Sequence, residues 1–216
     1  MAIDRKLHKY TLGEELLSSI SHGLGAILAL VGSILLGIKA ADNGTLQFIS
    51  VIIYGISMIL LYTGSTIYHA LAPNRGKQVL RILDHCFVYV LIIGSYAPFT
   101  LAGIQGWVGI TIFLVVLVLG IIGITLTAID MKRFSKFCFI CYLAMGWAIV
   151  IAIKPLINSL DSNGLIFLIT GGLVYTLGAV LYGIGKKYKY IHSVWHFFVL
   201  GGSVLHFLSI YYSIIH

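Results

Sequence analysis

The sequence predicts an all-α integral membrane protein with seven transmembrane helices. Hydrophobic residues make up 59% of the 216 residues and charged residues only 10%, whereas a soluble domain of this length carries about 25% charge. The apolar residues fall into seven runs, each close to the ~20 residues that a helix needs to cross a bilayer. Because these runs and their short loops use up the chain, we expect a single seven-helix membrane domain over residues 1–216.

The first three predicted spans are separated by turn-forming residues. The first span covers 18–40 and ends before the Asp-Asn-Gly turn at 42–44. The second covers 46–70 and ends before the Pro-Asn-Arg-Gly segment at 73–76, after which the third covers 80–102. Gly, Pro, Asn and Asp clusters mark loops between periodic segments. The first span follows basic residues, as a signal peptide does, but its length and the lack of a small-residue cleavage site predict that it is retained.

The last four predicted spans cover 106–128, 134–154, 163–185 and 190–215. The third of these follows the Asp-Ser-Asn-Gly turn at 161–164. A β-barrel strand would alternate apolar and polar residues over about 10 positions. The apolar run of the fourth span does not alternate, so helices are favoured over strands.

The basic residues predict how the chain is oriented in the membrane. Twelve of the 14 Lys and Arg residues lie in the N-terminal segment and in the second, fourth and sixth loops, and only Lys39 and Lys154 lie on the opposite face. Cytoplasmic loops carry an excess of Lys and Arg. We therefore expect a multi-pass protein of the cell (plasma) membrane, with the N-terminus cytoplasmic and His216 outside. The net charge of +7 is spread over separate loops, so no nucleic-acid partner is expected, and no soluble partner is evident.

Four polar residues are expected to meet near the cytoplasmic ends of their helices. His192 and His196 are four residues apart and therefore share one helix face. His69 ends the second span and Asp84 begins the third, at matching depth. Ionisable side chains inside a membrane usually face a cavity and serve a function. A single membrane histidine is more often an interhelical hydrogen-bonding residue, but this constellation favours a buried metal site.

Three imidazoles and one carboxylate suit Zn²⁺, which prefers four ligands and binds His nitrogen at about 2.0–2.1 Å. Three protein ligands and one water form an open, catalytic arrangement. Zinc lowers the pKa of such a water from 15.7 to about 7, and Asp84 could orient the water or take its proton.

These residues also resemble the motifs of a known family, and the resemblance covers essentially the whole chain. Ser65 and His69 match a Ser-x3-His motif, Asp84 a third-span aspartate, and His192 and His196 a seventh-span pair. The sequence is similar to bacterial hemolysin III-type members of the progestin and adipoQ receptor (PAQR) family, which is related more distantly to alkaline ceramidases.

The resemblance implies a seven-helix fold with zinc bound by His69, His192 and His196. It further implies that Asp84 holds the water at the metal and that Ser65 lies just behind the ligands. Ser18 stands where eukaryotic relatives often have Asn, so no role is carried over to that position. The sequence lacks the long N-terminal region of the animal receptors, so no hormone-receptor role is carried over.

Other polar residues of the spans are given weaker roles. Glu15 and His22 are interpreted either as a pair at the cytoplasmic mouth, which supports the metal ligands from behind or gates the site, or as interfacial side chains that reach towards water. His85 follows Asp84 and points about 100° away from it on a helix, so it is left out of the site. His206 lies on the His192 face about 20 Å deeper, too far for the same ion, and is expected to line the cavity. Cys138 is expected to pack in the interior without a disulfide, as is Cys141.

Three functions from different classes fit this sequence. The first is a zinc-dependent hydrolase of a lipid amide or ester, with membrane lipids as substrates. The second is a sensor or regulator of membrane lipids, in which zinc is structural and lipids are ligands. The third is a membrane-lytic, pore-forming protein, for which seven resident apolar helices give weak support, because a secreted toxin must stay soluble before insertion.

Overall fold

The computed structural model describes residues 10–184 and 188–215, and these ranges are helical, as predicted. Seven spans in the described ranges are long and apolar enough to cross a membrane. Some residues used to predict the orientation lie outside the described ranges. They are the basic residues Arg5, Lys6, Lys9, Lys186 and Lys187, and the C-terminal residue His216. The helices are α1 (Leu12–Ala40), α2 (Thr45–Ala70), α3 (Arg75–Ala97), η1 (Pro98–Ile104), α4 (Gly106–Asp130), α5 (Ser135–Trp147), η2 (Ala148–Ala152), α6 (Ile153–Ser159), α7 (Ser162–Ile184) and α8 (Ile191–Ser213).

The first span begins earlier than predicted. Helix α1 starts at Leu12, not at residue 18, because Thr11 and Glu14 form a capping box in which each side chain accepts a hydrogen bond from the other residue's backbone N–H. Glu14 and Glu15 therefore lie in the first turn of the helix, where the helix dipole favours acidic side chains. This early start brings both carboxylates up to the neighbouring helices.

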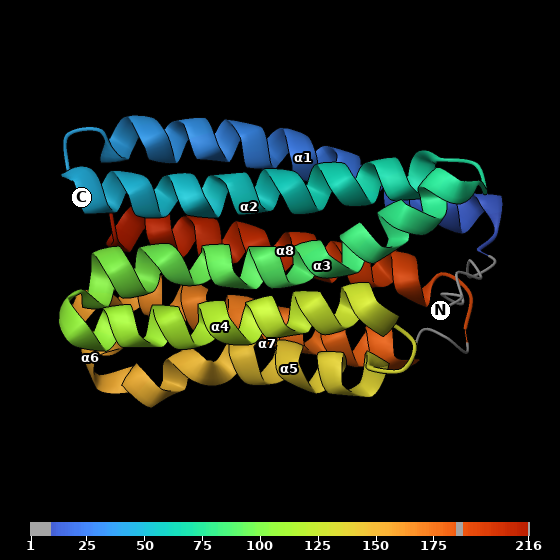
Figure 1. The fold of residues 1–216 in the computed structure, drawn as a ribbon. Coiled ribbons are helices and arrows are strands. Elements are labelled where there is room, and N and C mark those ends of the chain that lie inside the picture. The colour runs from blue at the N-terminus through green and yellow to red at the C-terminus, as the bar shows by residue number, and fades with distance from the viewer. Residues whose placement is uncertain (1–9, 185–187, 216) are drawn as a thin grey trace.

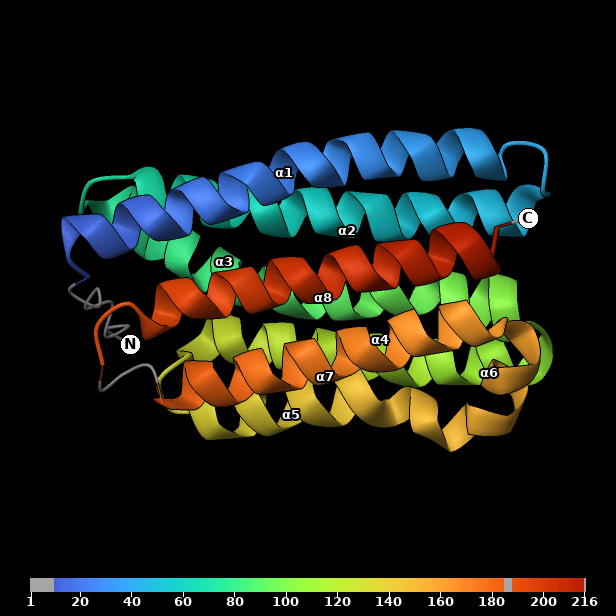
Figure 2. The ribbon, with the colours of Figure 1, turned by 180° about the vertical axis from the view of Figure 1, so that it is seen from behind.

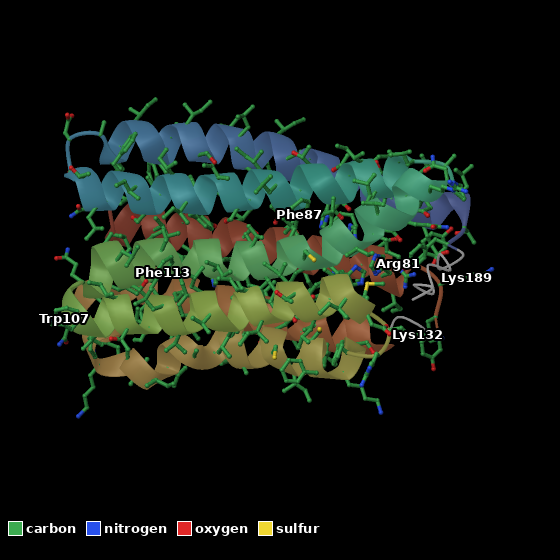
Figure 3. All side chains as sticks on the ribbon, viewed as in Figure 1. Arg81, Phe87, Trp107, Phe113, Lys132 and Lys189 are labelled. Atoms are coloured by element: carbon green, nitrogen blue, oxygen red, sulfur yellow. The ribbon has the colours of Figure 1, made fainter. Side chains whose placement is uncertain are left out.

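The first five helices pack in chain order, α7 packs against α5 and α8, and α8 returns to pack against α1. Figures 1 and 2 show α1 and α2 along one side of the bundle, α4 and α5 along the other, and α3 and α8 between them. Arg81, Lys132 and Lys189 lie at the same end of the bundle, whereas Trp107 lies at the opposite end (Figure 3). The start of α8 lies at this basic end, because Lys189 is only two residues before its first residue, Ile191.

Two spans depart from the α-helix where they face each other. The Tyr96 hydroxyl donates to the carbonyl of Met145 at 2.6 Å and accepts from the N–H of Ile149 at 2.9 Å. A side chain inserted in this way interrupts the backbone hydrogen bonds of a helix, and α5 gives way there to the 3₁₀ segment η2. In the third span, the α-helix changes into the π-helical η1 at Pro98, which has no N–H to donate. Departures of this kind are frequent at functional sites.

The outer and inner faces of the bundle differ in chemistry. Large apolar side chains are exposed along all seven spans, which suits contact with lipid. Inside, the hydroxyl of Tyr62 on α2 donates to Ser203 Oγ on α8 at 2.6 Å, and the hydroxyl of Tyr54 donates to the Ser203 carbonyl at 3.2 Å. Hydrogen bonds of this kind join helices in the membrane, where no water can satisfy a polar group. They hold α8 in a fixed rotation against α2.

Candidate metal centre

Three histidines from two helices meet at the basic end of the bundle. His69 comes from the last turn of α2, and His192 and His196 come from the first two turns of α8. The Nε2 atom of His192 lies 3.4 Å from Nε2 of His69 and 3.3 Å from Nε2 of His196. All three residues are buried, and their ligand atoms lie within 4.8 Å of one another. This group could hold a metal ion.

The other ring nitrogens of two of these histidines are engaged by α1. Nδ1 of His69 lies 2.7 Å from the Glu15 carboxylate, and Nδ1 of His196 lies 3.3 Å from the backbone carbonyl of Ser18. Partners of this kind fix the orientation of a metal-binding imidazole and leave Nε2 for the metal. The three Nε2 atoms therefore point towards one another because α1 orients two of the rings.

Glu15 is itself held by a buried lysine. The Lys77 ammonium lies 2.7 Å from Glu15 Oε1 and donates to the Leu71 carbonyl at 2.8 Å. Lys77 is only 3% exposed, so its charge is balanced by the carboxylate inside the protein. The sequence identifies Lys77 only as one of the basic residues near a loop, and no spacing between residues pairs it with Glu15.

Glu15 and His22 do not form a pair with each other, although each lies directly behind a histidine of the group. Glu15 contacts His69 and Lys77 instead, because the rotation of α1 turns Glu15 towards α2. The His22 ring stacks on His196, with ring centroids 3.7 Å apart and planes 18° apart. His22 is 3% exposed, and neither of its ring nitrogens has a hydrogen-bond partner. It is therefore a packing neighbour of the centre, not an interfacial side chain.

Asp84 and Ser65 lie on the wall of a cavity that also contacts His192 and His196. The cavity measures about 160 Å³ and is lined mainly by apolar side chains. Asp84 is not a member of the close histidine group. The Ser65 hydroxyl is buried and has no hydrogen-bond partner, so it remains available to a molecule in the cavity.

The structure adds a histidine and a tyrosine that the sequence reasoning missed. Helix geometry places His85 about 100° away from Asp84, yet His85 lines the same cavity, as does Tyr182 of α7. Nδ1 of His85 lies 2.8 Å from the Arg81 carbonyl, and Nε2 lies 3.2 Å from the Tyr182 hydroxyl. Because a carbonyl can only accept, Nδ1 donates to the Arg81 carbonyl, and in the neutral ring Nε2 then accepts from the Tyr182 hydroxyl. The only sequence signal was the adjacency of His85 to Asp84.

Tyr10 covers the histidine group from outside the membrane-spanning segment. Its ring stacks on His192, with centroids 4.9 Å apart and planes 20° apart, and lies 6.0 Å from the ring of His69. Burial raises the pKa of the Tyr10 phenol, so the ring stays neutral. The start of α1 is held in place by Glu14, whose carboxylate accepts from the backbone N–H of Tyr190 at 2.8 Å.

The cysteines and His206 behave as expected. Cys86, Cys138 and Cys141 are all free thiols. Cys138 is buried and contacts Thr127 Oγ1 at 3.4 Å, which confirms a packing position. His206 lines the cavity but is not a member of the histidine group.

The fold and the site together define a class: a seven-span helical membrane protein with a buried histidine group beside an apolar cavity. The comparisons with known proteins agree with this class. The family model described as "Haemolysin-III related" matches residues 10–207, and the chain belongs to this family. The sequence resemblance to hemolysin III-type members of the PAQR family is thereby confirmed.

Bacterial and animal relatives both align over nearly the whole chain. The "Hemolysin-3 homolog" of Bacillus subtilis is 40% identical over 93% of this chain and 94% of its own length. The "Hemolysin-3" of Bacillus cereus is 38% identical over 94% of this chain and 92% of its own. The human "Monocyte to macrophage differentiation factor" is 26% identical over 94% of this chain and 86% of its own.

Proposed function

We propose that this protein is a zinc-dependent hydrolase of an amide or ester bond in a membrane lipid. The observation that carries the proposal is the spacing of the three Nε2 atoms, 3.3 and 3.4 Å, beside an apolar cavity. Zinc binds His nitrogen at about 2.0–2.1 Å, and the edge of a tetrahedron of that radius is about 3.3–3.4 Å. The two edges that meet at His192, to His69 and to His196, therefore match a tetrahedral zinc site, and the ligand atoms of all three residues lie within 4.8 Å of one another.

Asp84 stands outside the histidine group and lines the cavity, so the three histidines would hold the zinc and leave a ligand position for water or substrate. A zinc ion there would polarise the carbonyl of the bond to be cleaved and lower the pKa of a nearby water. Asp84 would accept the proton of the attacking water at a carboxylate oxygen. The unpartnered hydroxyl of Ser65 would donate a hydrogen bond to the carbonyl oxygen as negative charge develops on it.

The shape and chemistry of the cavity favour an amphipathic substrate. Ser65, Asp84 and His192 line its histidine end, and most of the remaining wall is apolar. A lipid would place its amide or ester at the polar end and its acyl chain along the apolar wall. Membrane lipids are therefore the proposed substrates.

The test is lipid analysis of matched membranes incubated with purified wild type and with His192→Ala. A lipid cleaved by wild type alone would support hydrolysis. Zinc bound without any lipid cleaved would favour a sensor or regulator instead. The names of the two Bacillus relatives suggest hemolysis. Lysis of erythrocytes by the purified protein without lipid turnover would favour a membrane-lytic function.

We also propose that the histidine end faces the cytoplasm, in the plasma membrane. The support is the charge asymmetry of the sequence together with the position of Arg81, Lys132 and Lys189 at one end of the bundle (Figure 3). A reporter fused after the last residue should be active only outside the cytoplasm. Reporter activity inside the cell would overturn this orientation.

A further inference from the structure

The far end of the cavity contains an imidazole without a hydrogen-bond partner. His206 of α8 lies in the cavity wall, and both of its ring nitrogens are buried and unpartnered. The Leu168 carbonyl approaches the ring as a hydrogen-bond acceptor, but the contact falls short of full hydrogen-bond geometry at either ring nitrogen. Leaving a buried donor and a buried acceptor unpaired costs free energy, so this position has the capacity to bind a polar group.

The polar side chains around His206 are already satisfied within the protein. The Tyr175 hydroxyl lies 2.6 Å from Ser203 Oγ, and Thr176 Oγ1 donates to the Gly172 carbonyl at 2.7 Å. Neither hydroxyl turns to His206, although Tyr175 packs against its ring with centroids 5.2 Å apart. The unmet hydrogen-bonding capacity at this end of the cavity therefore belongs to His206.

The position of the ring is set by its neighbours. A side chain on Gly171 would collide with Cδ2 of His206 and would approach its Nε2 to 2.9 Å, so this edge of the ring lies against the backbone of α7. Phe99 packs on the ring edge to face, with centroids 6.0 Å apart. Glycine at 171 thus makes room for a fixed imidazole between α7 and the cavity.

His206 lies ten residues beyond His196 on the same helix, about 15 Å further along its axis. A lipid with its amide or ester at the histidine group would have its acyl chain near His206. A neutral imidazole offers one N–H donor and one lone pair. A hydroxyl group, which both donates and accepts, is the polar group that suits such a ring in either tautomer.

We propose that His206 forms a second binding subsite, which recognises a hydroxyl group carried on a lipid acyl chain far from its carbonyl. This proposal rests on one part of the proposed function, namely that a lipid acyl chain binds in the cavity. It requires neither bound zinc nor lipid turnover. It makes hydroxylated acyl chains the preferred ligands over plain ones of the same length.

The test compares the binding of palmitate and ω-hydroxypalmitate to the purified protein in phosphatidylcholine nanodiscs. Trp147 and Trp195 line the cavity and report binding by fluorescence, in a Trp107→Phe background because Trp107 is 84% exposed. The quantity measured is the ratio of the two Kd values, with His206 intact and in His206→Leu. Partitioning of the two acids into the bilayer is common to both proteins and cancels in this comparison.

We expect the preference for the hydroxylated acid to fall by about three- to tenfold in His206→Leu, the value of one hydrogen bond. His206→Asn, which keeps a donor and an acceptor, should retain part of the preference. Phe207→Leu is the matched control, because Phe207 packs against α1 near Gly32 and should leave the ratio unchanged.

An unchanged ratio in His206→Leu, with both acids bound, would overturn the subsite and leave the proposed hydrolase intact. It would mean that a buried water satisfies the ring. Failure of both acids to bind the protein with His206 intact would overturn the subsite and also count against a lipid substrate. His206→Leu should elute as a folded protein with unchanged metal content, since the substitution is remote from His196.

Discussion

His196 and His206 lie on the same helix and line the same cavity, yet their surroundings differ. His196 has the Ser18 carbonyl at one ring nitrogen and His192 at the other, and His22 stacks on its face. His206 has no hydrogen-bond partner at either nitrogen. Both residues are histidines on α8 that line one cavity, so these features do not explain the difference. The partners of each imidazole are set by the helices that surround it.

The largest expected effect separates these two histidines by metal content. Wild type should bind one zinc per chain, and His196→Ala should bind almost none, because two imidazoles are too few for a stable site. His206→Leu should keep its zinc. Elemental analysis of the purified proteins measures this. Equal zinc content in wild type and His196→Ala, or no zinc in wild type, would contradict the proposal that the three histidines bind zinc.

Substitution of Asp84 should reduce hydrolysis without removing zinc, unlike substitution of a histidine. Asp84→Asn should keep most of the zinc and lose hydrolysis by about 10²–10⁴-fold, the usual contribution of a general base, because the amide cannot take up the proton. Zinc content and lipid turnover are measured on the same preparation. Loss of zinc would make Asp84 a direct ligand and would favour a structural ion, whereas full activity would remove Asp84 as the base.

Glu15 should affect the metal through His69. We expect Glu15→Gln to weaken zinc binding by about 10- to 100-fold, the usual effect of removing a carboxylate that orients a metal-binding histidine. Titration with a competing chelator gives the affinity. Asp42→Asn, in the loop after α1, is the charge-matched control and should leave the affinity unchanged. An unchanged affinity in Glu15→Gln would show that the contact with His69 does not support the metal.

Tyr10 should control how quickly the metal leaves. Since Tyr10 stacks on His192, Tyr10→Ala should speed zinc removal by an excess of chelator roughly fivefold, as expected for the loss of about 1 kcal/mol of aromatic packing. Tyr188→Ala, at a 62% exposed tyrosine, serves as the control. Equal removal rates in both variants and wild type would mean that Tyr10 does not shield the centre.

The number of spans and the members of the histidine group followed from the sequence. Bilayer thickness fixes the length of an apolar run, so seven spans could be counted without knowing how they pack. The spacing of His192 and His196 fixes their common face. His69 could be placed beside them because successive spans must return to the same side of the membrane. These inferences depend on distance along the helix axis, which the sequence specifies directly.

The partners of these residues were decided by the tertiary structure alone. Glu15 contacts His69 instead of His22, His85 bonds Tyr182, and Tyr96 interrupts the fifth span. Each contact depends on how far one helix is rotated about its own axis against another. That rotation is set by packing and hydrogen bonding between helices, which no spacing within a single span contains.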